Sequence, residues 1–465
     1  MRTPVIPSVL LGVAVAVGCS SADGTGQGTP PVPWADLTAV KDTNPDPKVV
    51  EVSIEAGETT KEYLPGTRTK VLAYNGTVPG PIIEANAGDK LVVHLENSLS
   101  TATTIHWHGV RVPNDMDGAP SLQAPVQPGQ SFDYTFTLPD AGLFWFHPHV
   151  MEEVQIHQGL FGVIRVRGQS EPKVDDERVV VLDDVLLDKT GAFPTTIDSD
   201  TEMVGREGTV LVNGAQKPLL EWRAGALQRL RFVNVANARF FNLALAGYTF
   251  RVIGTDGGLM PQPYDTERLL VAPGERYDVV LIPKGQAGDE VVLTSEPYDR
   301  GHDTGKAKPV ELATLRISTE APLSGRVLPS AFPEIERLPG GPVDRTITFD
   351  EKFVDGHPTF TVDGMTYPDV PPIDVPNGSV HVLDLVNDAE MDHPFHLHGF
   401  FFQVLAQNGV EVAPERLANK DTMILPQKST TRVVVRFDRP GMWMYHCHIL
   451  EHVARGMMGE IHVEP

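Results

Sequence analysis

The sequence contains almost no cysteine: Cys19 and Cys447 are the two among 465 residues. Two cysteines cannot form a disulfide framework, so disulfides do not hold this fold together. Cys447 stands between two histidines in the stretch MYHCHILEHVARGMM, residues 444–458. An unpaired cysteine in such a setting indicates metal binding or reactivity.

Long apolar segments are absent apart from a short one at the amino terminus. Residues 1–19 combine one arginine, an apolar run too short to span a bilayer and small residues, which is typical of an export signal. The end of this segment, AVGC, resembles a bacterial lipobox and predicts a lipid anchor at Cys19. The alternative is an ordinary signal peptide that is removed together with Cys19. Residues 20–44 are then a flexible tether, and we expect a periplasmic or cell-envelope lipoprotein, or else a secreted protein.

Positive charge is also scarce, because 61 acidic residues face 38 basic ones and give a formal net charge of −23. No basic run is long enough to follow a phosphate backbone, which argues against nucleic acid as a partner. The acidic balance weakly favours cations, either as substrates or as bound metal ions.

Helical periodicity is scarce, whereas short strand-like runs recur along the whole chain. Segments such as DKLVVHLENS and TTRVVVRFDRPG are rich in Val, Leu and Phe and are bounded by Gly or Pro. They predict an all-β protein. A chain of 465 residues exceeds the roughly 250 residues of a large single domain, so we expect several sandwiches or barrels in series.

An internal repeat indicates how many domains there are. Residues 74–109, 212–245 and 362–399 share an Asn/Asp-Gly turn, a proline, a second turn with Gly, an apolar strand ending near Asn, and a closing strand. The repeat predicts three domains, over residues 45–168, 177–318 and 344–465. A Pro/Gly-rich linker, residues 319–343, precedes the third domain.

The histidines are concentrated in four His-x-His pairs, two in the first predicted domain and two in the third. Alternate residues of a strand face the same side, so each pair presents two imidazoles to one point. In the second domain Asn242 and Ala244 take the places of one such pair. We therefore expect the outer domains to face each other and gather eight imidazoles, which favour copper or zinc over magnesium or calcium. The pairs are His106/His108, His147/His149, His396/His398 and His446/His448.

Cys447 alternates with the histidines on either side, so its sulfur should face the opposite side of the strand and a different metal. The remaining ligands of that metal should be soft or borderline, and we expect His393, His452 and the thioether of Met457. Two histidines, one cysteine and a weak axial methionine form the blue-copper arrangement of electron-transfer sites.

With these motifs, residues 45–465 resemble the multicopper oxidases of the three-domain, bacterial, laccase-like type. The motifs that carry the resemblance are HWHG, HPH, HPFHLHG and HCHILEHVARGM. The resemblance implies three consecutive cupredoxin-like Greek-key β-sandwich domains and four copper ions per chain. It implies a type 1 copper at His393, Cys447, His452 and Met457, a type 2 copper at His106 and His396, and paired type 3 coppers at His108, His147, His149, His398, His446 and His448.

The resemblance also concerns protons. Asp117, in NDMDGAP, resembles an acid that family members place beside the trinuclear copper cluster to manage protons, although an Asp before Gly can also be a turn residue. Many relatives carry a Glu directly after the last type 1 histidine, and that position is Val453 here. We therefore expect Asp117 to carry an unusually large share of proton transfer.

The implied function is that of an oxidase. It takes electrons singly from a reducing substrate at the type 1 copper and reduces dioxygen to water. Phenols or aromatic amines are the first expectation for the substrate, because the 12 methionines form no methionine-rich segment of the kind found in metal-oxidising relatives. Cuprous or other metal ions are the alternative. We expect a monomer that contacts a membrane only through an anchor at Cys19. A copper nitrite reductase, a copper-free relative or a small blue-copper carrier would each lack part of this ligand set.

Overall fold

The structure, a computed structural model, describes residues 31–465. The predicted export signal, the lipid anchor at Cys19 and the first part of the tether lie outside the described residues. Residues Val32–Pro465 form one compact unit, so the boundaries predicted from the repeat remain predictions. No helix among the described residues is long and apolar enough to cross a membrane.

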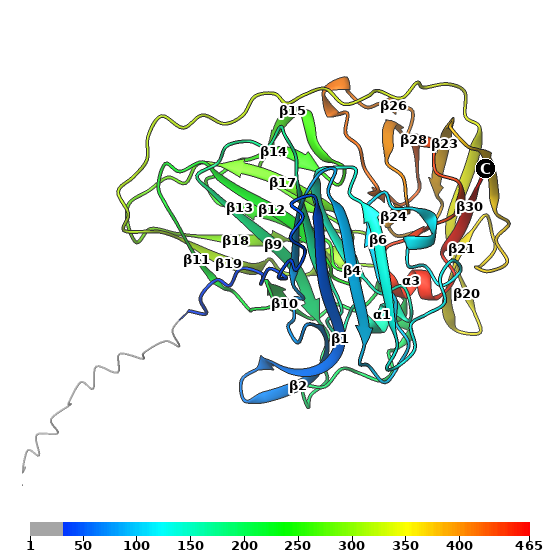
Figure 1. The fold of residues 1–465 in the computed structure, drawn as a ribbon, viewed down its shortest axis with the longest axis horizontal. Coiled ribbons are helices and arrows are strands. Elements are labelled where there is room, and N and C mark those ends of the chain that lie inside the picture. The colour runs from blue at the N-terminus through cyan, green and yellow to red at the C-terminus, as the bar shows by residue number, and fades with distance from the viewer. Residues whose placement is uncertain (1–30) are drawn as a thin grey trace, which may run out of the picture. The chain divides into compact units, whose positions relative to one another are not determined.

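The described chain consists mostly of β-strands, which form six sheets (Figure 1). The sheets come in three successive pairs along the chain, and each pair encloses one apolar core. This confirms the predicted all-β class with three sandwiches. The alternation that formed the basis of the prediction is visible in β1, where Val50, Val52, Ile54 and Ala56 are buried and the residues between them are more exposed.

The first sandwich contains the strands up to residue 167. One sheet has the order β2 (Thr67–Tyr74), β1 (Val49–Leu64), β4 (Lys90–Asn97), β6 (Ser131–Thr137). The other has the order β3 (Ile82–Asn86), β8 (Gly162–Arg167), β7 (Gly142–His147), β5 (His106–His108).

The second sandwich is larger. Its first sheet has the order β10 (Thr209–Val212), β9 (Asp176–Val185), β12 (Gln228–Asn234), β17 (Arg276–Leu281), β14 (Phe250–Thr255), β15 (Gly258–Thr266). Its second has the order β11 (Leu219–Trp222), β19 (Val310–Ile317), β18 (Glu290–Glu296), β13 (Phe241–Leu245), β16 (Arg268–Val271).

The third sandwich completes the set. Its first sheet has the order β21 (His357–Val362), β20 (Arg345–Val354), β23 (Ser379–Asn387), β28 (Ser429–Phe437), β25 (Phe402–Gln407), β26 (Val410–Glu411). Its second has the order β22 (Ile373–Pro376), β30 (Met458–Glu464), β29 (Gly441–Cys447), β24 (His393–Leu397), β27 (Thr422–Leu425).

The repeat seen in the sequence corresponds to a repeat in strand pairing. The first long strand of each sandwich pairs in parallel with the apolar strand of the repeat, as β1 with β4, β9 with β12, and β20 with β23. The short strand that precedes the apolar strand pairs in parallel with the last strand of its sandwich, as β3 with β8, β11 with β19, and β22 with β30. The closing strands β5, β13 and β24 therefore occupy equivalent places, and the two outer ones carry the histidine pairs.

Helices are short and lie in the connections. The α-helices are α1 (Glu152–Gln155), α2 (Ser199–Val204) and α3 (Leu450–Ala454), and the 3-10 helices are η1 (Asn114–Met116), η2 (Thr304–Lys306) and η3 (Pro414–Arg416). Helix α3 contacts both α1 and α2, so segments of all three sandwiches meet at α3. Figure 1 shows α1 close to α3. Residues 319–343 contain no helix or strand and run along the upper edge of Figure 1.

Candidate metal centre

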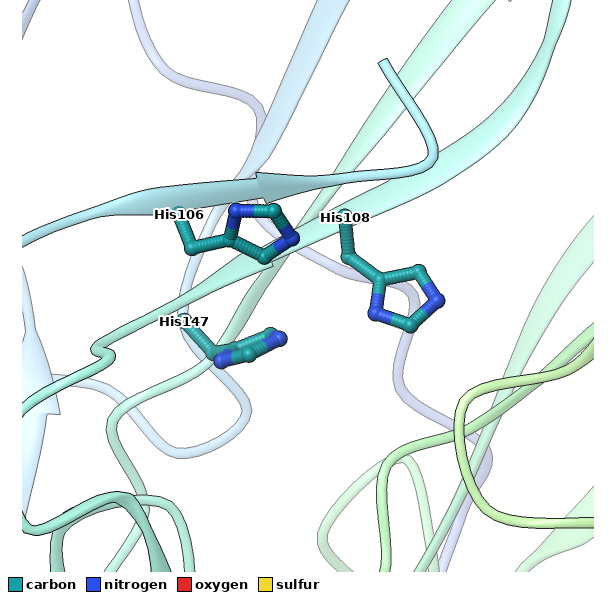
Figure 2. Close-up of side chains that lie close together, drawn as sticks. All are labelled: His106, His108 and His147. Atoms are coloured by element: carbon teal, nitrogen blue, oxygen red, sulfur yellow. The ribbon is translucent and has the colours of Figure 1, made fainter. Parts of the chain in front are cut away.

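The histidine pairs of the first sandwich come from two neighbouring strands. β5 pairs with β7 in antiparallel orientation, and this register puts His106 opposite His147. Figure 2 shows the rings of His106 and His108 leaving the same strand and lying close to the ring of His147. One nitrogen from each ring lies within 4.8 Å of the other two, a spacing that could hold a metal ion.

The third sandwich presents its histidines in the same way, because β24 pairs with β29 and puts His396 opposite His446. The two halves face each other. The ring of His106 is stacked on His398 with centroids 3.8 Å apart, and the ring of His108 on His396 at 3.7 Å. This confirms that the outer domains face each other across the eight imidazoles.

All eight rings are buried, and burial lowers the pKa of seven of them. The pKa values of His398 and His448 fall to about 4 and about 3, with burial as the largest cause. Burial also lowers the pKa well below the usual value for His108, His147, His149, His396 and His446. A neutral imidazole is the form that binds metals.

The free nitrogens of these rings fit a metal cluster. Buried polar atoms are normally hydrogen-bonded, yet many ring nitrogens here have no partner. They are Nε2 of His106, His147, His149 and His396, Nδ1 of His108, and both nitrogens of His448.

The contact between His398 and His446 also indicates a metal ion. Their Nε2 atoms lie 3.1 Å apart, while the Nδ1 of His398 donates to Asp117 and the Nδ1 of His446 donates to the carbonyl of Cys447. Both Nε2 atoms therefore carry lone pairs directed at each other, which is favourable only with a cation between them.

The orientation of the rings follows the same two-fold pattern. The first histidine of each pair on β5 and β24 donates its Nδ1–H to the carbonyl of a later aspartate, and the first histidine of each pair at the end of β7 and β29 donates to the carbonyl of the next residue. The bonds are His106 to Asp117 at 3.0 Å, His396 to Asp421 at 3.0 Å, His147 to Pro148 at 2.9 Å, and His446 to Cys447 at 2.8 Å. Each bond fixes the tautomer and leaves Nε2 free for a metal.

A second candidate centre lies on the other face of β29. The Sγ of Cys447 is 3.5 Å from the Nδ1 of both His393 and His452, whose Nδ1 atoms are 3.1 Å apart. All three side chains are fully buried. Met457 lies in the same core cluster as Cys447, and its N–H donates to the carbonyl of His452. The expected grouping of one thiol and two imidazoles is thus present in one place, and the backbone of Met457 lies beside it.

Comparison with known proteins identifies the family. Residues 55–171, 178–318 and 339–465 each match a family model described as multicopper oxidase. The multicopper oxidase MmcO of Mycobacterium tuberculosis is 30% identical over 439 residues, which cover 85% of this chain and 83% of that protein. The chain belongs to the multicopper oxidases. Its cofactor is therefore copper, its electron acceptor is dioxygen, and the two groups of ligands fit a type 1 and a trinuclear copper centre.

Solved structures of this multicopper oxidase's relatives share the whole fold. A multicopper oxidase from Campylobacter jejuni, described as a metallo-oxidase, is 30% identical with a TM-score of 0.83 and covers 94% of this chain and 96% of its own. A laccase from Pediococcus acidilactici is 28% identical with a TM-score of 0.81 and covers 94% of this chain and 95% of its own.

The assignment of individual histidines to type 2 and type 3 copper remains a prediction. The structure brings the eleven histidine and cysteine residues among the predicted ligands into the two groups just described. Among the described residues, no candidate ligand group includes a residue of the second sandwich. There the Asn242 side chain donates to the carbonyl of Pro297 on its own sandwich.

Asp117 of this multicopper oxidase is fully buried against the trinuclear ligands. Its Oδ2 accepts from the Nδ1 of His398 at 2.9 Å, and its Oδ1 lies 3.4 Å from the Nδ1 of His106. Burial alone would raise the pKa of Asp117, but the attraction of His398 and His106 outweighs it and holds the pKa well below its usual value. The backbone of Asp117 does close the η1 turn, since its N–H bonds to Asn114. The side chain, however, is directed at the metal ligands.

Reasoning from the sequence missed a second carboxylate, Asp421. Its Oδ1 lies 3.3 Å from the Nε2 of His108, and both carboxylate oxygens accept bonds from Arg276 at 2.6 Å. Arg276 belongs to the second sandwich, which therefore supports a centre to which it gives no ligand. Asp421 is equivalent to Asp117, because the carbonyls of both accept a bond from the first histidine of a pair. This equivalence could have revealed Asp421, but the contact between Asp421 and His396 depends on the β24–β27 register.

Neither Val453 nor the nearby Glu451 is directed at the metal ligands. Val453 is buried and offers no titrating group. Glu451 is buried too, but its Oε1 accepts from Arg206 at 2.5 Å and Asn237 at 3.0 Å, so it joins α3 to the second sandwich.

The axial position gives a direct test. A weak thioether stabilises the oxidised type 1 copper, so Met457→Leu should raise the reduction potential by roughly 60 mV, a tenfold change for one electron. Met458 lies in a different apolar cluster and is the matched control. Redox titration of the blue band measures both variants. An unchanged potential in Met457→Leu would remove this residue from the ligand set.

Proposed function

We propose that this multicopper oxidase takes its electrons from a small metal cation, with Cu(I) as the first candidate. The observation that carries the proposal is an acidic cover over the two type 1 histidines, His393 and His452, which are inaccessible to solvent. A phenol or an aromatic amine cannot touch either imidazole. The sequence favoured these organic substrates and kept metal ions as the alternative, whereas the acidic residues of the cover favour the metal ion.

The cover over His452 comes from the second sandwich. The Nε2 of His452 donates to the carbonyl of Met203 in α2 at 2.8 Å. On another side, Phe360 stacks on the same ring with centroids 3.8 Å apart. The edge of the imidazole from which an electron donor would be expected to approach is therefore closed by a helix backbone. A donor must therefore transfer its electron through this cover.

The exposed charges of the cover are acidic. Asp198 caps α2 and Asp200 lies in its first turn, and both are exposed, whereas Glu202 is buried and paired with Arg455 and His357. A patch of one charge sign raises the local concentration of the opposite ion and can speed association by about 10 to 10³-fold at low ionic strength. The patch favours a cationic donor over a neutral aromatic one.

The protein residues fix the path between the two centres. Bound copper supplies one-electron transfer at the type 1 position and reduction of dioxygen to water at the trinuclear position. Cys447 faces the first centre while His446 and His448 face the second, so three consecutive residues connect them. The hydrogen bonds from the Nδ1 atoms hold the imidazoles in the tautomer that a metal needs.

The relatives include both substrate classes. The Campylobacter jejuni structure is described as a metallo-oxidase, and the Pediococcus acidilactici structure as a laccase. Their similarity to this chain is nearly equal, so the preference for a metal ion is based on the cover.

Replacing α2 tests the proposal. In a variant with residues 199–204 exchanged for six Gly and Ser residues, we expect kcat/KM for 2,6-dimethoxyphenol to rise by about tenfold, equivalent to about 1.4 kcal/mol. In the same variant kcat/KM for Cu(I) should fall, because the acidic cover is lost. Oxygen uptake measures both substrates. A wild-type enzyme that already prefers the phenol, or a variant that gains nothing on it, would contradict the proposal.

A charge variant separates closure from electrostatics. Asp198→Asn with Asp200→Asn keeps a capping residue and should preserve the helix. It should lower kcat/KM for Cu(I), more at low salt than at high salt, and leave the phenol unaffected. Glu96→Gln on β4 is the matched control for the loss of surface charge.

A further inference from the structure

Three methionines that lie far apart in the sequence line one pocket beside the trinuclear centre. The pocket has a volume of about 490 Å³, and its walls include Met151, Met444, Met458 and the trinuclear ligand His149. Met151 is 48% exposed, Met458 is half-buried and Met444 is 3% exposed, so the thioethers extend from the surface inwards. No segment of the sequence is rich in methionine, and only the fold brings these three together.

The pocket reaches the cluster at its most accessible ligand. His149 is 7% exposed, whereas each of the other seven paired histidines is at most 1% exposed. Among the described residues, solvent therefore comes nearest to the cluster where His149 meets the pocket.

Two buried polar atoms at this end have no partner. The Oε2 of Glu152 and the Nε2 of His149 are both unpaired and lie 3.5 Å apart. Glu152 is buried, and Glu153 lines the same wall. Buried polar groups without partners are rare in proteins and mark a place where a ligand is expected.

We propose that this methionine pocket binds Cu(I) and is the route by which copper enters the trinuclear centre. Thioethers are soft ligands that select Cu(I), while imidazoles accept either oxidation state of copper. The carboxylates of Glu152 and Glu153 offset the charge of the ion. Entry is a series of ligand exchanges from the thioethers to His149 and requires no electron transfer. The proposal goes beyond the oxidase activity, since it concerns how the enzyme acquires its cofactor.

The test measures copper incorporation rather than turnover. The apoprotein carrying Cys447→Ser is mixed anaerobically with Cu(I) held by a chelator, and the filling of the trinuclear centre is followed by metal analysis and by the type 2 electron paramagnetic resonance signal after reoxidation. In the same background we change Met151, Met444 and Met458 together to Leu, which nearly conserves volume. We expect the loading rate from Cu(I) to fall at least about tenfold. Loss of a residue that supports a metal site typically lowers metal affinity by about this factor. Loading from Cu(II) should be unchanged.

The control is Met365→Leu, an exposed methionine that does not line the pocket. Equal loading rates from Cu(I) in the triple variant and the control would overturn the proposal and leave the pocket as a passage for water or dioxygen only. Equal losses for Cu(I) and Cu(II) would also overturn it, because they would indicate a general distortion.

A second measurement does not depend on the folding of the triple variant. Silver(I), a redox-inert probe with the same preference for thioethers, is titrated calorimetrically into the copper-loaded wild-type enzyme. We expect Ag(I) binding that weakens at least about tenfold in Met444→Leu alone. Absence of Ag(I) binding in the wild type, or binding that does not respond to Met444→Leu, would overturn the proposal.

Discussion

Cys447→Ser is expected to give a colourless protein that retains its trinuclear copper and no longer oxidises substrate. The Sγ of Cys447 lies 3.5 Å from each of the two type 1 imidazoles, and serine offers a hard hydroxyl in place of the soft thiolate. The variant should lose one copper ion, the blue absorption and at least about 10³-fold in kcat, since no other site accepts single electrons from the donor. The fold should persist, because the exchange is nearly isosteric.

Metal analysis, absorption spectra and oxygen uptake measure these effects. Cys19→Ser, which removes the other cysteine, is the matched control and should remain blue and active. A blue Cys447→Ser protein would mean that the type 1 centre is built on other residues. Loss of all copper would mean that the two centres do not fill independently.

Asp117→Asn is expected to slow reoxidation by dioxygen by about 10 to 100-fold while the anaerobic reduction of the blue copper keeps its rate. The carboxylate receives hydrogen bonds from an imidazole of the third sandwich and lies beside one of the first, so it acts on both halves of the trinuclear centre. An amide keeps the shape but directs an NH₂ group at one of the two donors. It also cannot pass protons, which the reduction of dioxygen consumes.

Stopped-flow absorbance separates the two half-reactions. Asp115→Asn is a close control, because Asp115 lies in the same 3-10 helix but is exposed. If Asp117→Asn reoxidises like the wild type, another group relays the protons and Asp117 is only a turn residue. A slower anaerobic reduction would indicate damage that spreads to the type 1 centre.

The parts of the site that the sequence predicted depend on local geometry. A strand alternates its side chains with a period of two, so the facing of His446 and His448 away from Cys447 could be read from three consecutive letters. The repeat indicated that the outer domains are equivalent, and this equivalence predicted that they face each other. His106 and His398 are accordingly stacked across two sandwiches.

The parts that it missed depend on contacts between distant segments. Asp421 acts through the pairing of β24 with β27 and through Arg276, 145 residues away in the chain. The cover by Met203 comes from α2, a six-residue helix in a connection of the second sandwich, which is too short to show a helical pattern in the sequence. The methionine pocket escaped notice because its three members are spread over 308 residues, from Met151 to Met458.

The division of the eight imidazoles between residues 106–149 and 396–448 has a consequence for biosynthesis. Domains emerge from the ribosome amino terminus first, so a growing chain carries half of the ligands long before the other half exists. Four imidazoles from one side are only half of the ligands of the shared cluster. The trinuclear centre can thus be completed only after His446 and His448, at the end of β29, have joined the third sandwich, so that filling of this centre waits for nearly the whole chain.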